Sequence, residues 1–160
     1  MTQPVAIVAA GVLLLPVCGV LAAVDARSHR LPDRLVALAY AVLLVPLVAG
    51  VLAGSVTGSR LGWALAAGAV TMVGYFLLGL LRVGGLGLGD VKLSGALGTW
   101  LGLFGWEAAV AGVVLTFVLG GLWALTLLVS RRAGLRDHVA LGPWMILAAA
   151  LVTAGAGLGS

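Results

Sequence analysis

The chain has 160 residues, of which 62% are hydrophobic and only 9% are charged. Soluble globular domains average about 45–50% apolar and about 25% charged residues, so this composition excludes that class. The net charge is +4, but the longest run of basic residues is the pair Arg131–Arg132. Basic residues spread this thinly do not indicate a nucleic-acid partner. Cys18 is the only cysteine, so a disulfide framework and a cysteine-rich zinc module are also excluded.

Six stretches that contain no Asp, Glu, Lys, Arg or His divide the chain. In order they are 1–24, 35–59, 61–81, 93–106, 108–130 and 139–160. Five of them are long enough for a helix of roughly 20 residues to cross a hydrocarbon core. The fourth is short, so we expect its helix to begin at Asp90, below the membrane surface.

The sequence therefore predicts an all-α, polytopic membrane helix bundle. Its single domain, 1–160, is expected to contain six transmembrane helices at 4–24, 35–54, 61–81, 90–105, 107–129 and 139–158. The first apolar stretch has no Lys or Arg before it, so it is interpreted as a retained helix and not as a cleaved signal.

The distribution of Lys and Arg predicts the orientation of the bundle. Loops 25–34, 82–92 and 131–138 fall on one side and contain eight of the nine basic residues, whereas the other side has only Arg60. Because cytoplasmic loops are enriched in Lys and Arg, the three basic loops are predicted to be cytoplasmic. Residues 55–60 and both termini are then external.

Two of the five acidic residues are candidates for a catalytic role. Asp25 ends the first predicted helix, where the helix dipole disfavours a carboxylate, and Asp90 closes the glycine-rich segment 84–90. Ionisable groups at membrane depth are costly and are often functional. Two carboxylates that face each other can share a proton, so that one activates water while the other protonates a carbonyl oxygen. A pair of Asp25 with Arg27, and an ordinary N-cap role for Asp90, are the alternatives.

The remaining ionisable residues have simpler interpretations. Asp33 precedes the second apolar stretch and is interpreted as a structural N-cap. Glu107 lies in a first helical turn, and Asp137 lies among arginines. His29 and His138 share no ligand spacing and are interpreted as loop residues, so no metal or other cofactor is expected.

Three motifs resemble those of type IV prepilin peptidases, which are GxGD intramembrane aspartyl proteases. Segment 87–93, Gly-Leu-Gly-Asp-Val-Lys-Leu, is similar to the GxGDxKL motif of that family. Segment 25–33, an Asp followed by a basic stretch and Leu-Pro-Asp, resembles its first motif. Segment 141–144, Leu-Gly-Pro-Trp, resembles its closing aromatic-Gly-Pro-aromatic motif, with Leu141 in place of the usual Phe.

The resemblance implies an aspartic endopeptidase whose two catalytic residues are Asp25 and Asp90. The residues expected to bind substrate or to make loop 82–92 flexible are Gly87, Gly89 and Lys92. The residues expected to be structural are Pro32, Asp33, Gly142 and Pro143.

The resemblance also implies substrates and a location. Members of the family remove the short basic leader of prepilin-like proteins at the cytoplasmic face of the inner membrane, so these proteins and the lipid bilayer are the expected partners. Larger members add a cytoplasmic domain with paired CxxC motifs and methylate the new N-terminus. This chain resembles the short forms that act on Flp/Tad-type or archaeal-like substrates, and methyltransferase activity is not expected.

Two other functions compete with this interpretation. The first is a small transporter or channel subunit that uses the paired aspartates as a proton relay. The second is a presenilin-like GxGD protease, although Val24 stands where that group usually has Tyr before the aspartate.

Overall fold

The computed structural model describes residues 4–28, 32–81, 87–130 and 141–158, and these contain six α-helices and no strand. The helices are α1 (Val5–Ser28), α2 (Asp33–Leu52), α3 (Gly58–Leu81), α4 (Leu88–Gly102), α5 (Trp106–Val129) and α6 (Gly142–Leu158). The predicted all-α bundle of six helices is confirmed. Each helix end lies within four residues of its predicted position.

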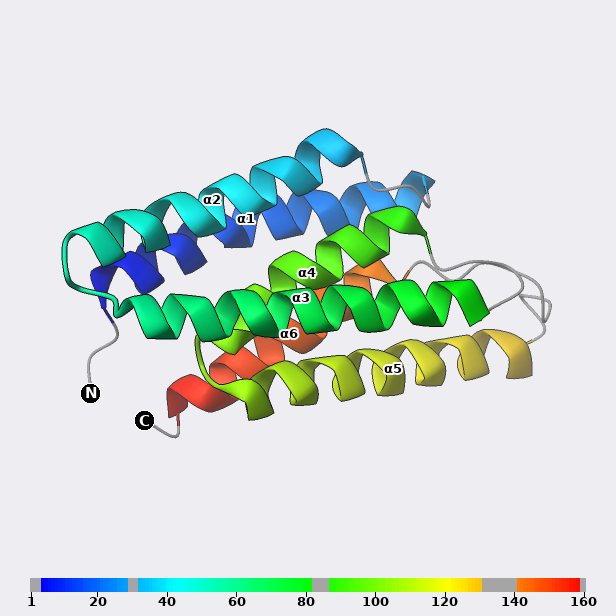
Figure 1. The fold of residues 1–160 in the computed structure, drawn as a ribbon. Helices are drawn as coiled ribbons and strands as arrows, with labels where there is room; N and C mark the ends of the chain where they lie inside the picture. The colour runs from blue at the N-terminus through cyan, green and yellow to red at the C-terminus, as the bar shows by residue number, and fades with distance from the viewer. Residues whose placement is uncertain (1–3, 29–31, 82–86, 131–140, 159–160) are drawn as a thin grey trace.

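Consecutive helices run in opposite directions and form three hairpins, α1–α2, α3–α4 and α5–α6 (Figure 1). At one end of the bundle α1, α3 and α5 finish and α2, α4 and α6 begin. We call this the aspartate end, because Asp25 lies in the last turn of α1 and Asp33 and Asp90 lie in the first turns of α2 and α4. The first turn of α1 and the last turn of α6 lie at the opposite end (Figure 1).

The short helix α4 is the centre of the bundle and packs against α2, α3, α5 and α6. Ten of its 15 residues are buried, many of them Gly, Ala, Ser or Thr. A Cβ atom built on Gly68 of α3 would lie 2.6 Å from the Gly95 carbonyl oxygen, and one built on Gly102 would lie 2.8 Å from Ala67 Cβ. Small residues therefore allow α3 and α4 to approach backbone to backbone, as is common between membrane helices.

The outer surface of the bundle is apolar. Large hydrophobic side chains are exposed along its helices, including Val5, Leu52, Trp63, Leu81 and Val129. Four helices, α1, α2, α3 and α5, are long and apolar enough to cross a membrane, and α6 contains a shorter apolar stretch, Gly142–Ala156. Water would disfavour so much exposed apolar area, whereas lipid would solvate it, so these features support a multi-pass membrane protein.

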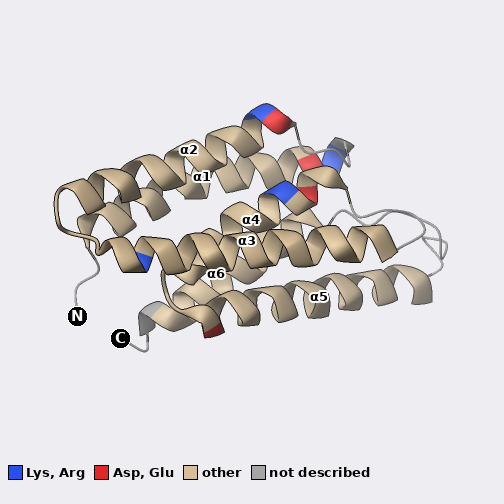
Figure 2. Cartoon of the chain, viewed as in Figure 1, with Lys and Arg blue, Asp and Glu red and all other residues tan. Residues whose placement is uncertain are grey.

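Charged residues gather at the aspartate end (Figure 2). Six of the eight charged residues that the structure describes lie in helix turns there, namely Asp25, Arg27, Asp33, Arg34, Asp90 and Lys92. The other two, Arg60 and Glu107, lie at the starts of α3 and α5 at the opposite end. Arg60 Nε donates a hydrogen bond of 3.0 Å to the Leu103 carbonyl oxygen, which follows the last turn of α4.

Candidate active site

Asp25 is a buried carboxylate held between two helices. It lies in the last turn of α1 and is only 4% exposed. Its Oδ2 atom accepts a hydrogen bond of 3.1 Å from the backbone N–H of Gly142, the first residue of α6. The side chain therefore uses an N–H group that the start of a helix would otherwise leave unsatisfied. Residues 25 and 142, which are far apart in the sequence, meet at this contact.

Gly142 leaves no room for a side chain beside Asp25. A Cβ atom at this position would lie 2.6 Å from Asp25 Oδ2 and 3.2 Å from Asp25 Cγ. Pro143 follows in the first turn of α6, where the missing N–H of proline costs no intrahelical hydrogen bond. The Gly-Pro pair thus opens α6 with one N–H directed at the carboxylate.

Asp90 lies in the first turn of α4, three residues after the N-cap residue Gly87. Its Oδ1 atom is buried and has no hydrogen-bond partner among the residues that the structure describes. Asp90 is thus not the N-cap residue of α4. The Gly87 carbonyl oxygen accepts the N–H groups of Asp90 and Val91, at 3.0 and 3.2 Å.

The two aspartates lie at the same end of the bundle on helices whose backbones stay apart. Each is within electrostatic range of the other. No Cα atom of α1 lies within 8 Å of a Cα atom of α4. Away from the aspartate end, the Trp100 side chain of α4 reaches α1. A Cβ atom on Gly11 of α1 would lie 2.7 Å from the Trp100 ring.

Gly87 and Gly89 precede Asp90 in positions that differ from the sequence-based expectation. Because α4 begins at Leu88 and not at Asp90, Gly89 lies inside the helix together with Lys92, and substrate binding by these residues stays a prediction. The Gly87 backbone has φ −60° and ψ 138°, which any residue adopts. A Cβ atom there would lie 3.6 Å from Asp90 Oδ2, in ordinary contact, so Gly87 borders the carboxylate without being required by the backbone.

Asp33 is not the N-cap of α2, so that prediction is wrong. Pro32 occupies the N-cap position, and its carbonyl oxygen accepts the N–H groups of Leu35 and Val36 at 3.0 and 3.2 Å. The Asp33 carboxylate instead forms an ion pair of 2.7 Å with Lys92 Nζ. This pair is exposed to solvent and links the first turns of α2 and α4.

Tyr40, which sequence patterns did not indicate, joins the same two helices. The Tyr40 hydroxyl group donates a hydrogen bond of 2.9 Å to the Lys92 carbonyl oxygen. A tyrosine in an apolar stretch has no local pattern that reveals such a partner 52 residues away. With the Asp33–Lys92 ion pair, this bond ties the start of α4 to α2.

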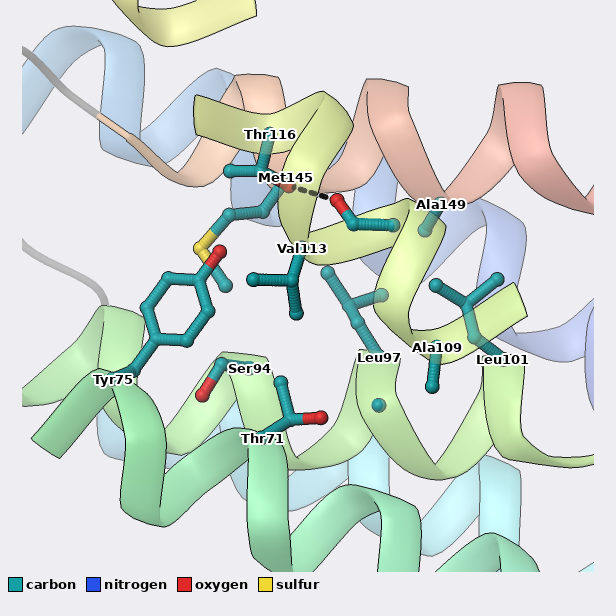
Figure 3. A pocket seen from close by; sticks show the side chains of 12 residues that line it. Thr71, Tyr75, Ser94, Leu97, Leu101, Ala109, Val113, Thr116, Met145 and Ala149 are labelled. Atoms are coloured by element: carbon teal, nitrogen blue, oxygen red, sulfur yellow. Dashed lines mark hydrogen bonds between the residues drawn. The ribbon is translucent and has the colours of Figure 1, made fainter. Parts of the chain in front are cut away.

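A small internal cavity of about 20 Å³ lies between α3, α4, α5 and α6, and is large enough for about one water molecule (Figure 3). Its polar lining comes from Thr71, Tyr75, Ser94 and Thr116. Tyr75 is 2% exposed, lies beside Thr116 and is within electrostatic range of Asp90. Sequence patterns did not indicate this cavity.

Some predicted features fall outside the described residues. These are His29, Asp137 and His138, the basic residues Arg30, Arg82, Arg131, Arg132 and Arg136, and the glycines at 84 and 85. Within the part of the chain that is described, no three His, Cys, Asp or Glu side chains form a group that could hold a metal ion.

Known proteins resemble this chain over most of its length. A sequence model of the type IV leader peptidase family matches residues 12–125. A prepilin leader peptidase/N-methyltransferase from Dickeya chrysanthemi is 37% identical over 142 residues, which cover 82% of this chain and 45% of that protein. One from Aeromonas salmonicida (strain A449) is 29% identical over 147 residues, which cover 87% of this chain and 46% of that protein.

The chain thus spans less than half the length of these curated relatives. No solved structure matches it. The matched region begins within α1 and ends within α5, so it includes both Asp25 and Asp90 together with the helices that carry them. On these grounds the chain belongs to the type IV leader peptidase family.

Proposed function

We propose that the chain is an aspartic endopeptidase that removes the basic leader from type IV prepilin-like proteins at the cytoplasmic face of the inner membrane. One observation carries the proposal. Two helices bring Asp25 and Asp90, both largely withdrawn from solvent, to the same end of an apolar bundle whose sequence belongs to a leader peptidase family.

Hydrolysis by such a pair needs one ionised and one protonated carboxyl group. The ionised group takes a proton from water while the water oxygen bonds to the carbonyl carbon of the leader peptide bond. The protonated group gives its proton to the carbonyl oxygen. When the tetrahedral intermediate collapses, the C–N bond breaks, the nitrogen takes the proton from the first carboxyl group, and the second regains its own. Both aspartates return to their starting states.

The charges at the aspartate end support a cytoplasmic active site and a basic substrate. Eight of the nine Lys and Arg residues fall in segments 25–34, 82–92 and 131–138 of the sequence. The three of them that the structure describes, Arg27, Arg34 and Lys92, lie at the aspartate end. Cytoplasmic loops carry such an excess. A leader that ends in the cytoplasm would enter at this end, and its scissile bond would have to unwind for both carboxyl groups to reach the carbonyl.

The substrates we propose are the prepilin-like proteins of Flp/Tad-type or archaeal-like systems. Their basic leader would approach a site whose two aspartates carry a net negative charge when one of them is ionised. Gly87 borders Asp90 without a side chain, which leaves space for an extended peptide backbone beside the carboxylate.

A proton relay across the membrane is less well supported. Such a relay needs hydrogen-bonding groups that hand a proton from one side chain to the next. Among the described residues, the hydroxyl groups of Thr71, Ser94 and Thr116 beside the cavity each donate to a carbonyl oxygen of their own helix. They are therefore committed to local bonds within α3, α4 and α5.

Co-expression with a candidate prepilin tests the proposal, with leader removal measured by the change in substrate mass. We expect the wild-type chain to remove the leader, and the Asp25→Asn and Asp90→Asn variants to insert into the membrane without cleaving it. Asparagine preserves the shape of aspartate but cannot exchange a proton as a carboxyl group does. The Asp33→Asn variant is the control and should cleave. Full cleavage by Asp25→Asn or by Asp90→Asn would contradict the proposal.

A further inference from the structure

The two aspartates differ in the groups that contact them. Asp25 Oδ2 accepts the Gly142 N–H at the start of α6, where the helix dipole places partial positive charge. Asp90 also lies in a first helical turn, but its buried Oδ1 atom has no hydrogen-bond partner in the described part of the chain. A backbone N–H donor favours the charged form of a carboxyl group, whereas burial without a donor favours the neutral form.

We infer that Gly142 is a positioning residue that holds Asp25 as the ionised member of the pair, which leaves Asp90 as the protonated member. This inference rests on the proposed peptidase function and adds a role to each carboxyl group. Asp25 is then the base that takes the proton from water, and Asp90 is the acid that protonates the carbonyl oxygen of the scissile bond.

The start of α6 acts on Asp25 through its backbone. Helix α6 contains no charged residue, so its effect on Asp25 comes from the N–H group of Gly142 and from the helix dipole. Lys92 forms an exposed ion pair with Asp33.

The absence of a side chain at Gly142 makes this contact possible. A Cβ atom there would lie 2.6 Å from Asp25 Oδ2, so an alanine must push the carboxylate away or separate α1 from α6. Either movement lengthens the hydrogen bond to the N–H. The ionised form of Asp25 would lose its donor, and a larger share of Asp25 would then be protonated.

Modification by dicyclohexylcarbodiimide tests which carboxyl group is protonated, because this apolar reagent adds to protonated carboxyl groups. The full-length protein in lipid vesicles is treated without substrate, and the modified residues are identified by mass spectrometry. We expect Asp90 to react about tenfold faster than Asp25. In the Gly142→Ala variant we expect modification of Asp25 to rise several-fold.

Two glycine variants provide matched controls. Gly155→Ala adds a methyl group to α6 where no atom lies within 4 Å. Gly120→Ala adds one on α5 that meets Leu141 Cδ1 at 2.9 Å, so it disturbs the residue before Gly142 without touching Asp25. Both controls should keep the wild-type ratio of modification. Gly142→Ala should also lower kcat for leader cleavage about tenfold or more while KM stays within about twofold, because the contact acts on the reacting groups.

The labelling result does not depend on cleavage, so it can fail while the proposed function stands. Equal or faster reaction of Asp25 in the wild-type protein would overturn the inference, and so would an absence of reaction at both residues. An unchanged ratio in folded Gly142→Ala would show that Gly142 has only a structural role. If Gly142→Ala does not fold, the wild-type ratio decides the assignment of the proton.

Discussion

Asp25 and Asp90 reach the same end of the bundle through different local structures. Asp25 comes from the last turn of α1, where its own helix dipole opposes a negative charge, and it is compensated by the first N–H of α6. Asp90 comes from the first turn of α4, where the dipole is favourable but none of the described residues donates a hydrogen bond to the buried Oδ1 atom.

The Asp33–Lys92 ion pair provides a contrast, because both of its side chains are well exposed, at 75% and 48%. Exposed ion pairs contribute about 0–1 kcal/mol to stability. We therefore expect Asp33→Asn to lower the free energy of unfolding by less than about 1 kcal/mol and to retain most leader cleavage. Thermal unfolding in detergent and the cleavage assay measure the two effects. A loss of activity as complete as that of Asp25→Asn would mean that Asp33 takes part in the chemistry.

Much of the site at the residue scale could be predicted from the sequence, and the rest depends on tertiary packing. Asp25 and Asp90 stand out because carboxyl groups are rare in a chain this apolar. The contact between Asp25 and Gly142 joins residues 117 positions apart, so no local pattern reveals it. The cap role predicted for Asp33 failed because α2 begins directly after Pro32, which leaves the Asp33 carboxylate free to pair with Lys92.

At the scale of the helices, α4 determines how the two aspartates are placed. Its small residues bring it against α3, and the Tyr40 hydroxyl and the Asp33–Lys92 pair fix its first turns to α2. At its other end, the Trp100 indole donates a hydrogen bond of 2.9 Å to Thr153 Oγ1 of α6. Helix α4 is therefore held from several sides, while its backbone stays apart from that of α1.

This separation predicts the result of disulfide crosslinking between α1 and α4. A disulfide needs Cα atoms about 4.4–6.8 Å apart, whereas no Cα pair between these helices lies within 8 Å. We expect an Asp25→Cys, Asp90→Cys variant that also carries Cys18→Ala to remain uncrosslinked without substrate. Addition of a prepilin peptide should increase crosslinking if the helices close around it.

A positive control for this experiment lies between α3 and α4. A Cβ atom on Gly102 would lie 2.8 Å from Ala67 Cβ, so cysteines at these two positions start close together. Efficient crosslinking of positions 25 and 90 without substrate would show that the helices already meet in the resting protein. Closure on substrate binding would then be wrong.

At the scale of the whole molecule, length and composition were enough to predict the bundle. Long uncharged stretches form helices in lipid. The ends of these helices are predicted by the positions of charged residues and glycines. The alternation of six helices then places every second connection at the same end. The largest difference between a predicted and an observed helix end is at α1, which continues to Ser28, past the predicted end at residue 24. Asp25 is consequently inside the helix, in its last turn.

The orientation of the bundle in the membrane can be tested by labelling of introduced cysteines. We expect a Thr57→Cys variant in a Cys18→Ala background to react with an impermeant maleimide from outside the cell. An Arg34→Cys variant should react from the cytoplasmic side only. Both positions are exposed, one between α2 and α3 and the other at the start of α2. Labelling of position 57 from the cytoplasm would reverse the proposed orientation.

The central claim is that Asp25 and Asp90 act as one catalytic unit, and a double-mutant cycle on purified protein tests it most directly. Cleavage of a prepilin substrate in lipid vesicles is measured for Asp25→Asn, Asp90→Asn and the double variant. Residues that act as a unit have strongly non-additive effects, so we expect each single variant to lower kcat about a thousandfold or more, and the double variant to be no slower than the singles. Independent, additive losses, or near-normal cleavage by either single variant, would contradict the account.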